Sequence, residues 1–312
     1  MATVTGYPGS FQKMDLEKKA IERIKMASEM SLHHYEKPLM CTYSGGKDSD
    51  VMLELFKRSG VPFEVHNSHT TVDAPQTIYH IRRKFKKLEE MGILCDIEKP
   101  TYKGNRITMW TLIPQKGMPP SRLMRYCCAV LKETGCANRF IATGVRWDES
   151  NARAERGAYE VIGKTKADMI TATDEIMLMN DNSTKRKMTE NCMKKNKMVV
   201  NPIIDWRHRD IWDFIQSEHI DYNPLYDCGY KRVGCIGCPM AAKSRWKEFS
   251  DFPTYQRAYI RAFDKMLERL KAKWKDKPPR WKSGYDVFLW WMEDKNVEGQ
   301  MDLFEDGFVS EN

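Results

Sequence analysis

The feature that most constrains this chain is an apolar strand that runs into a glycine-rich turn and then into a helix. Residues 38–43 (PLMCTY) predict a buried strand, residues 44–49 (SGGKDS) the turn, and residues 50–56 (DVMLELF) the start of a helix. Two adjacent glycines let the backbone approach a bound group, and the free N–H groups at the start of a helix point at an anion. The sequence therefore predicts a phosphate-binding loop, in which Lys47 adds a positive charge and two serines add hydroxyl donors.

The spacing of this loop differs from that of the Walker A loop, G-x-x-x-x-G-K-[ST]. A Walker loop that ended on Lys47 would need glycine at the position of Cys41 and serine or threonine at the position of Asp48. The loop therefore represents another class of phosphate site.

Strands and helices alternate along most of the chain. Further strands are expected at residues 63–66, 93–97, 140–143 and 198–202, and further helices at residues 13–36, 75–91 and around residues 211–215. Such alternation predicts an α/β fold, a parallel sheet with helices on both faces. Ligands of these sheets bind beyond the carboxyl ends of the strands, and most of the conspicuous motifs stand directly after an expected strand.

Two further segments differ from this pattern in composition. Residues 180–198 are polar and basic and predict an exposed loop, whose lysines either contact a nucleic-acid backbone or are simply solvated. Residues 243–295 are aromatic-rich and predict a C-terminal helical part that packs on the sheet. The expected organisation is an N-terminal helix at residues 1–37, a nucleotide-binding domain at residues 38–240, a helical part at residues 241–298 and a flexible tail at residues 299–312.

Composition favours a cytoplasmic protein. No stretch approaches 18 consecutive apolar residues, and the N-terminal segment lacks the apolar region of a signal peptide. The net charge of +8 favours phosphorylated or polyanionic partners, although lysines and arginines that merely solvate the surface give the same charge. In the cytoplasm the nine cysteines are expected to be reduced thiols rather than disulfides.

Four of these cysteines predict a metal centre. Cys127 and Cys128 are adjacent, and Cys235 and Cys238 form a C-x-x-C pair. Four thiolates can bind zinc or an iron–sulfur cluster, and adjacent cysteines fit a cube with four separate irons better than one tetrahedral ion. We therefore expect a [4Fe–4S] cluster on these four residues. A structural zinc, plain buried thiols, or Cys228 in place of Cys128 are the alternatives.

A cluster of charged residues follows the expected strand at residues 140–143. Arg146 and Arg153 can reach a common site, and guanidinium groups bind phosphate or sulfate in a bidentate manner. Glu149 either orients one of these arginines or ligates the Mg²⁺ that accompanies ATP. A surface helix with internal ion pairs is the alternative.

Several motifs together resemble a known family. The hexapeptide at residues 44–49 resembles the PP-loop of ATP pyrophosphatases, which cleave between the α- and β-phosphates of ATP. The motifs that resemble the phosphoadenosine phosphosulfate (PAPS) and adenylyl-sulfate reductase family are residues 70–77 (TTVDAPQT), Arg125-x-Cys-Cys128 with Lys132, the G-x-R-x-x-E-S-x-x-R motif of residues 144–153, residues 201–206 (NPIIDW), residues 223–227 (NPLYD) and residues 234–239 (GCIGCP).

The resemblance covers roughly residues 38–240 and implies an adenine nucleotide alpha-hydrolase-like fold. It implies a catalytic set made of Lys47, Asp48, Arg146, Glu149 and Arg153. It implies a nucleotide-binding set made of Ser44, Gly45, Gly46, Lys47, Asp48, Ser49, Thr71, Asp73, Lys132 and Gly144. The CC…CxxC arrangement of adenylyl-sulfate reductases implies the same four [4Fe–4S] ligands, Cys127, Cys128, Cys235 and Cys238.

The sequence departs from the reductases at the attacking thiol. Those enzymes use a cysteine in a C-terminal E-C-G-(L/I)-H motif, because a thiolate is needed to attack the sulfate sulfur. Here no cysteine follows Cys238, and Cys192 would replace the missing one only in an unusual arrangement.

Family members without that tail cysteine imply another reaction. They use ATP to activate an acceptor for sulfur insertion, as in tRNA thiolation or DNA phosphorothioation, and they need a sulfur donor. The expected function is therefore cleavage of ATP to AMP and pyrophosphate for sulfur transfer onto nucleic acid. One alternative is an adenylyl-sulfate or PAPS reductase that uses a thiol from elsewhere, such as a thiol reductant protein. The other is a non-catalytic nucleotide-sensing module with a DNA-bound partner.

The C-terminal segment carries one more pattern. Gln300–Phe304 (QMDLF) resembles the peptide by which bacterial proteins dock on the replicative sliding clamp, which implies the clamp as a partner. The alternative is that Leu303 and Phe304 cover the last helix.

Overall fold

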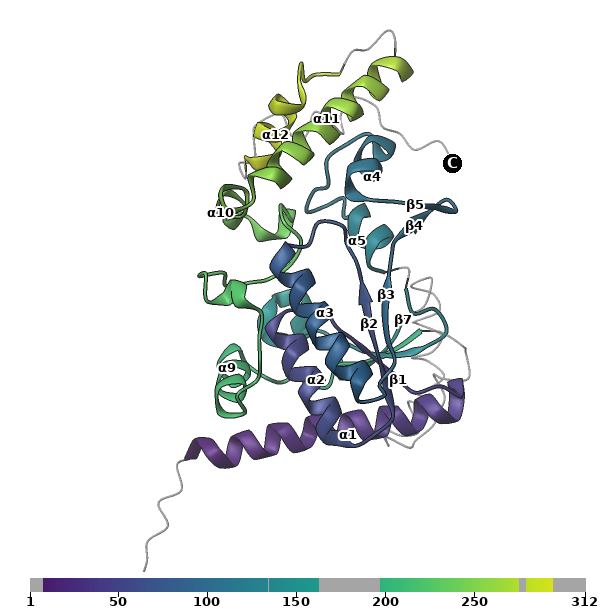
Figure 1. The fold of residues 1–312 in the computed structure, drawn as a ribbon, viewed down its shortest axis with the longest axis vertical. Helices are drawn as coiled ribbons and strands as arrows, with labels where there is room; N and C mark the ends of the chain where they lie inside the picture. Colours follow the sequence, from purple (N-terminus) through teal and green to yellow (C-terminus); the bar gives the residue numbers. More distant parts are fainter. Residues whose placement is uncertain (1–7, 134, 163–196, 275–278, 294–312) are drawn as a thin grey trace, which may run out of the picture. The chain divides into compact units, whose positions relative to one another are not determined.

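The computed structural model describes residues 8–133, 135–162, 197–274 and 279–293 (Figure 1). The chain divides into two compact units. The first is built from residues 1–100 and 131–234, and the second from residues 101–130 and 235–312. The basic residues before Lys197, Cys192 and the segment Gln300–Phe304 lie outside the described residues.

A six-stranded sheet forms the centre of the first unit (Figure 1). Its strands, in spatial order, are β3 (Cys95–Glu98), β2 (Phe63–Ser68), β1 (Leu39–Thr42), β6 (Phe140–Ala142), β8 (Lys197–Val200) and β7 (Tyr159–Ile162). All neighbours pair in parallel except β7, which runs antiparallel to β8. The mostly parallel α/β sheet expected from the sequence is therefore confirmed.

The edge strand β7 was not expected from the sequence. It is only four residues long, and Glu160 interrupts its apolar residues, so no continuous apolar run marks it. Lys197 and Met198, which the sequence analysis counted with the polar loop at residues 180–198, belong to β8.

Helices of the first unit flank the sheet. They are α1 (Pro8–Tyr35), α2 (Lys47–Ser59), α3 (Pro75–Glu90), the short α6 (Asn151–Ala154) and α9 (His208–Ser217). Both α2 and α3 start where a parallel strand must be followed by a crossover, and α3 has proline in its first turn, where no N–H is needed. The 3₁₀ turns η1 (Trp147–Glu149) and η2 (Pro224–Tyr226) add two short connections.

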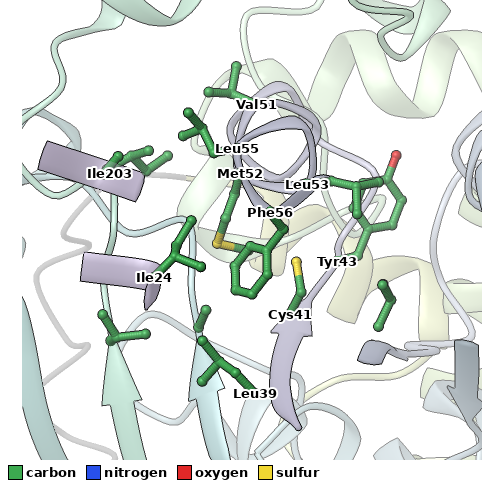
Figure 2. Packing of buried hydrophobic residues seen from close by; sticks show 14 of the residues in the cluster. Ile24, Leu39, Cys41, Tyr43, Val51, Met52, Leu53, Leu55, Phe56 and Ile203 are labelled. Carbon is green, nitrogen blue, oxygen red and sulfur yellow. The ribbon is translucent and has the colours of Figure 1, made fainter. Parts of the chain in front are cut away.

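The core of the first unit lies between the sheet and these helices. Figure 2 shows Ile24 of α1 and Phe56 of α2 close to Leu39 and Cys41 of β1, and all four side chains are fully buried. The opposite face of the sheet carries Met40, Ile141 and Val199 with Cys136 packed against them. Because side chains alternate along a strand, residues 39 and 41 face one side and residue 40 the other.

The second unit is mainly helical. It contains a two-stranded hairpin, β4 (Thr101–Tyr102) with β5 (Asn105–Arg106), and the helices α4 (Met109–Lys116), α5 (Tyr126–Leu131), α10 (Ser244–Asp251), α11 (Pro253–Lys273) and α12 (Gly284–Met292), with the 3₁₀ turn η3 (Pro239–Ala241). The helical character expected for residues 243–295 is confirmed for the described part. Helix α11 packs on α4 and on α12, and the ring of Trp291 lies 4.8 Å from that of Tyr259. Among the described residues, no helix combines the length and the apolar character needed to cross a bilayer.

Ile24 tests how strongly α1 is held on this core. Its side chain is fully buried, so Ile24→Ala should lower the free energy of unfolding by about 2–5 kcal/mol, through lost burial and the cavity left behind. Lys25→Ala, at the next and exposed position, should change it by less than about 0.5 kcal/mol. Urea denaturation of both variants measures the difference, and equal losses would mean that α1 does not pack as described.

Candidate functional site

The loop at residues 44–49 connects β1 to α2 as a tight turn. Gly45 has φ +74°, a conformation that side chains rarely adopt. A Cβ atom there would lie 2.9 Å from Cγ1 of Ile81 and 3.1 Å from Cγ2 of Thr77, both on α3. Only glycine therefore fits, because the backbone turns directly against α3.

Serine side chains hold the turn closed. The hydroxyl of Ser49 donates to the Gly46 carbonyl at 2.7 Å, and the hydroxyl of Ser44 lies 3.3 Å from that of Ser49. The Asp50 N–H donates to the Gly46 carbonyl at 3.0 Å, which starts the helix. Helix geometry leaves the N–H groups of Asp48 and Ser49 without an intrahelical acceptor, so they are positioned for an anion.

Asp48 lies between two buried cations. Its Oδ1 accepts from Nε of Arg146 at 2.7 Å, and its Oδ2 accepts from Nζ of Lys47 at 3.1 Å. Lys47 and Arg146 are only 6% and 3% exposed. Arg146 also lies 3.7 Å from the Asp148 carboxylate, so both cations at the carboxyl ends of β1 and β6 are paired with carboxylates.

The residues after β6 are joined in one network. Gly144 lies against the Asp48 backbone, 3.4 Å from its carbonyl atoms when a Cβ is added. The Arg146 N–H donates to Oε2 of Glu149 at 3.0 Å, and the same carboxylate pairs with Arg153. Both predicted roles of Glu149 stay predictions. Its carboxylate pairs with Arg153, which fits an orienting role, and a carboxylate is also a suitable Mg²⁺ ligand.

The buried carboxylate of Asp50, in the first turn of α2, stabilises the position of the loop. Asp50 is 2% exposed and accepts from the Tyr43 hydroxyl at 2.5 Å and from Nε2 of His80 at 2.9 Å. Burial, and then the charge of Asp50, raise the pKa of the Tyr43 phenol far above its ordinary value, so Tyr43 stays a donor. These bonds tie β1 and α3 to the first turn of α2.

The NPLYD segment at residues 223–227 forms hydrogen bonds to the loop. The buried amide of Asn223 donates to the Gly45 carbonyl at 2.9 Å and to the Thr77 hydroxyl at 3.1 Å. The hydroxyl of Tyr226 accepts from the Lys47 N–H at 3.0 Å. Sequence reasoning assigned no role to Asn223, Tyr226 or Asp50, although two of them lie in a quoted motif and Asp50 directly follows the loop.

Three predicted nucleotide-binding residues lie farther along the same sheet edge. Thr71, with φ +67°, and Asp73 form the turn between β2 and α3, where the Asp73 carboxylate accepts from the Thr70 N–H at 3.0 Å. Lys132 is exposed, and its carbonyl accepts from the Ser68 hydroxyl at the end of β2. The nucleotide-binding role of these three residues stays a prediction.

The four predicted cluster ligands all belong to the second unit. A hydrogen bond with Cys128, burial, and the neighbouring Cys235 and Cys238 all raise the pKa of the Cys127 thiol. All four side chains are half-buried, and Nη2 of Arg125 lies 3.4 Å from the sulfur of Cys128. The structure thus gathers the CC and CxxC pairs, while the exposed Cys228 lies in the first unit.

Close packing fixes the loop between Cys235 and Cys238. The Gly237 N–H donates to Glu248 at 2.7 Å, and the Tyr259 hydroxyl donates to the Ile236 carbonyl at 2.9 Å. Gly237 has φ +73°, and a Cβ atom there would lie 2.6 Å from the Phe249 ring and 3.1 Å from the Trp291 ring. The aromatic residues of the C-terminal helices therefore form the floor of this loop.

The donor set fits an iron–sulfur cluster chemically, because four neighbouring thiols are its usual ligands. Among the described residues, no group of three or more His, Cys, Asp or Glu side chains is arranged to hold a metal ion. The four cysteines match the ligands of a cluster in type, and the cluster itself stays a prediction.

Comparison with known proteins places these features in a family. The model of the phosphoadenosine phosphosulfate reductase domain matches residues 38–241. The adenosine 5'-phosphosulfate reductase of Anoxybacillus flavithermus is 35% identical over 251 residues, which cover 75% of this chain and 89% of that protein.

Two further similarities are more distant. An uncharacterized protein of Methanocaldococcus jannaschii is 25% identical over 283 residues, 86% of this chain, and the chain spans only 59% of that relative's length. The crystal structure of phosphoadenylyl-sulfate (PAPS) reductase from Candida auris in its phosphate complex is similar with a TM-score of 0.44 and 18% identity, covering 75% of this chain and 98% of that chain.

Gly237 gives a test of the packing around the C-x-x-C loop. Gly237→Ala should lower the free energy of unfolding by about 2–4 kcal/mol, since it combines the strain of a positive φ with crowding against Phe249. Gly104→Ala is the matched control in the same unit, with φ +79° and open space around its Cβ, and should cost only about 1–2 kcal/mol. Thermal unfolding compares the two, and equal shifts would contradict the close approach.

Proposed function

Because the chain belongs to the phosphoadenosine phosphosulfate reductase domain family, we propose that it binds an adenine nucleotide at residues 44–49 and cleaves ATP to AMP and pyrophosphate. The cleavage activates an acceptor, nucleic acid in this proposal, for sulfur transfer. The observation that carries the proposal is the ionic arrangement Lys47–Asp48–Arg146 directly beside the free N–H groups of α2.

The proposed site holds the phosphates by several kinds of donor. The backbone N–H groups of Asp48 and Ser49 and the ammonium of Lys47 face the same end of α2. Arg146 uses its Nε for Asp48 and one Nη for the Trp206 carbonyl at 3.3 Å, which fixes its plane. A guanidinium fixed in this way stabilises charge that develops on a departing pyrophosphate without having to reorganise.

Carboxylates near the loop suit the magnesium ion that accompanies ATP. Asp48 and Glu149 are the two acidic residues of the predicted catalytic set, and carboxylate oxygens are preferred Mg²⁺ ligands. When bound there, Mg²⁺ would neutralise part of the phosphate charge.

The thiols of the second unit supply the sulfur chemistry in this proposal. Cys127, Cys128, Cys235 and Cys238 would hold a [4Fe–4S] cluster, which would supply an iron site for sulfur chemistry. The basic net charge of +8 supports a polyanionic acceptor. We propose a cytoplasmic protein with the nucleotide-binding domain at residues 38–240, and with the sliding clamp as a partner of Gln300–Phe304.

A second function has specific support. The relative that is 35% identical is an adenosine 5'-phosphosulfate reductase, which favours a sulfonucleotide as the substrate. The reductase reaction needs a thiolate that attacks the sulfate sulfur, and no cysteine follows Cys238 in the sequence. ATP activation is therefore placed first, and a reductase that takes its thiol from a partner second.

A substrate panel separates these functions. The protein is incubated without oxygen with ATP, adenylyl sulfate or PAPS, each with and without RNA and DNA, and pyrophosphate, AMP and sulfite are measured. Pyrophosphate with AMP from ATP is the expected result. Release of sulfite from a sulfonucleotide would instead support the reductase function. Nucleotide binding without any product would support a non-catalytic sensing module.

Lys47 tests the loop directly. Lys47→Ala should lower the rate of ATP cleavage about 100-fold or more, because it removes a charge that faces the phosphates. Lys57→Ala, on the exposed part of the same helix and paired with Glu54, should leave the rate unchanged. If the two variants retained equal activity and bound ATP equally, the loop would not be the nucleotide site.

Iron content tests the cysteine set. Cys235→Ser should remove most of the iron and acid-labile sulfide from protein purified without oxygen. Cys228→Ser is the matched control and decides between the two predicted ligand sets. Full iron in the Cys235→Ser variant would reject the cluster assignment, and loss of iron in the Cys228→Ser variant would move the fourth ligand to Cys228.

A further inference from the structure

Tyr226 places a hydroxyl group at the entrance of the phosphate loop. Its oxygen accepts from the Lys47 N–H at 3.0 Å and lies 3.5 Å from the point where a Cβ of Gly46 would be. The Lys47 ammonium lies 5.6 Å from the centre of the same ring. Neither the expected catalytic set nor the expected nucleotide-binding set includes this residue.

The surrounding residues hold Tyr226 in one position. Asn223, three residues earlier, is fully buried and bonds to Gly45 and Thr77, while its side-chain oxygen accepts from the Leu225 N–H at 3.1 Å. The ring of Trp212 lies edge-on to that of Tyr226, with 5.2 Å between centres. The hydrogen bonds of Asn223 thus fix the backbone that carries Tyr226, and Trp212 fixes the ring.

The Tyr226 hydroxyl acts as an acceptor toward the protein and still carries a proton. Burial raises the pKa of this phenol well above its ordinary value, against the lowering effect of the hydrogen bond from the Lys47 backbone. Within the described part of the chain, the oxygen receives the Lys47 N–H and no acceptor for its own proton is found. The Tyr226 side chain is partly exposed, so this proton remains available to a group that binds at the loop.

We propose that Tyr226 is a phosphate-binding residue of this site, which accepts the Lys47 N–H and donates its own O–H to a phosphate oxygen of the nucleotide. The inference rests on the proposed binding of nucleotide phosphates at residues 44–49. The Tyr226 hydroxyl links the Lys47 N–H, at the start of α2, to the phosphate through one additional hydrogen bond. Hydrogen bonds joined in such a chain polarise and strengthen one another. The phosphate keeps the N–H groups of Asp48 and Ser49 as direct donors, so Tyr226 adds a contact and need not be displaced.

The test measures binding of inorganic pyrophosphate, ATP and adenosine by calorimetry. Tyr226→Phe keeps the ring and removes the hydroxyl, and should weaken pyrophosphate and ATP binding about tenfold or more, as expected for a hydrogen bond to a charged group. Adenosine binding should not change, because adenosine has no phosphate. Tyr222→Phe is the matched control, since the Tyr222 hydroxyl bonds to Asp227 at 2.7 Å instead of to the loop, and it should bind all three ligands normally.

Each other result rejects the proposal. Equal or tighter pyrophosphate binding by Tyr226→Phe would mean that the hydroxyl is neutral or competes with phosphate for the Lys47 N–H. An equal loss for adenosine would reduce Tyr226 to a structural support. The readout is independent of turnover. Suppose that the wild-type protein fails to cleave ATP while Tyr226→Phe still weakens pyrophosphate binding. That combination would reject the proposed reaction and support the role of Tyr226.

Discussion

The buried carboxylate of Asp50 is the interaction on which the first unit depends. It belongs to the first turn of α2 and is bonded to Tyr43, just after β1, and to His80 of α3. A buried charge is tolerated only when it is hydrogen-bonded, and removing one partner of such a group costs about 3–5 kcal/mol. The direction of α2 is therefore fixed by strong polar contacts as well as by the apolar core in Figure 2. Because the phosphate loop is the entrance to α2, its N–H groups are held in a defined direction before any ligand is considered.

Parallel strand order then decides which distant residues meet. Strand β1 lies between β2 and β6, so the segments that follow these strands emerge at one edge of the sheet. Asp48 and Arg146 are 98 residues apart in sequence and 2.7 Å apart in space for this reason. The pairing leaves Arg146 buried, with its guanidinium plane fixed by the Asp48 carboxylate and the Trp206 carbonyl. The NPLYD segment joins the loop to α3, because the Asn223 amide donates both to the Gly45 carbonyl and to the Thr77 hydroxyl.

Sequence reasoning reached the parts of this arrangement that local pattern specifies. Short strand-like segments identified β1, β2, β3, β6 and β8, and the glycine pair identified the loop, because each signal is contained in a few neighbouring residues. Strand β7 was missed because four residues at a sheet edge carry no such run. The role of Tyr226 was missed for another reason: its partner Lys47 is 179 residues away, and a motif names residues without giving their partners. The same holds for Gly237, whose need for glycine arises from Phe249 and Trp291 and from no feature of the C-x-x-C pattern itself.

The segment after Tyr226 connects the two chemistries in one stretch of chain. Tyr226 bonds to the phosphate loop, and Cys235, nine residues later, begins the C-x-x-C pair of the second unit. Gly237 leaves that pair little freedom, because aromatic rings and Glu248 hold its backbone. The chain around Asn223 and Tyr226 has equally little conformational freedom, because the Asn223 amide is bonded to the Gly45 carbonyl and to the Thr77 hydroxyl.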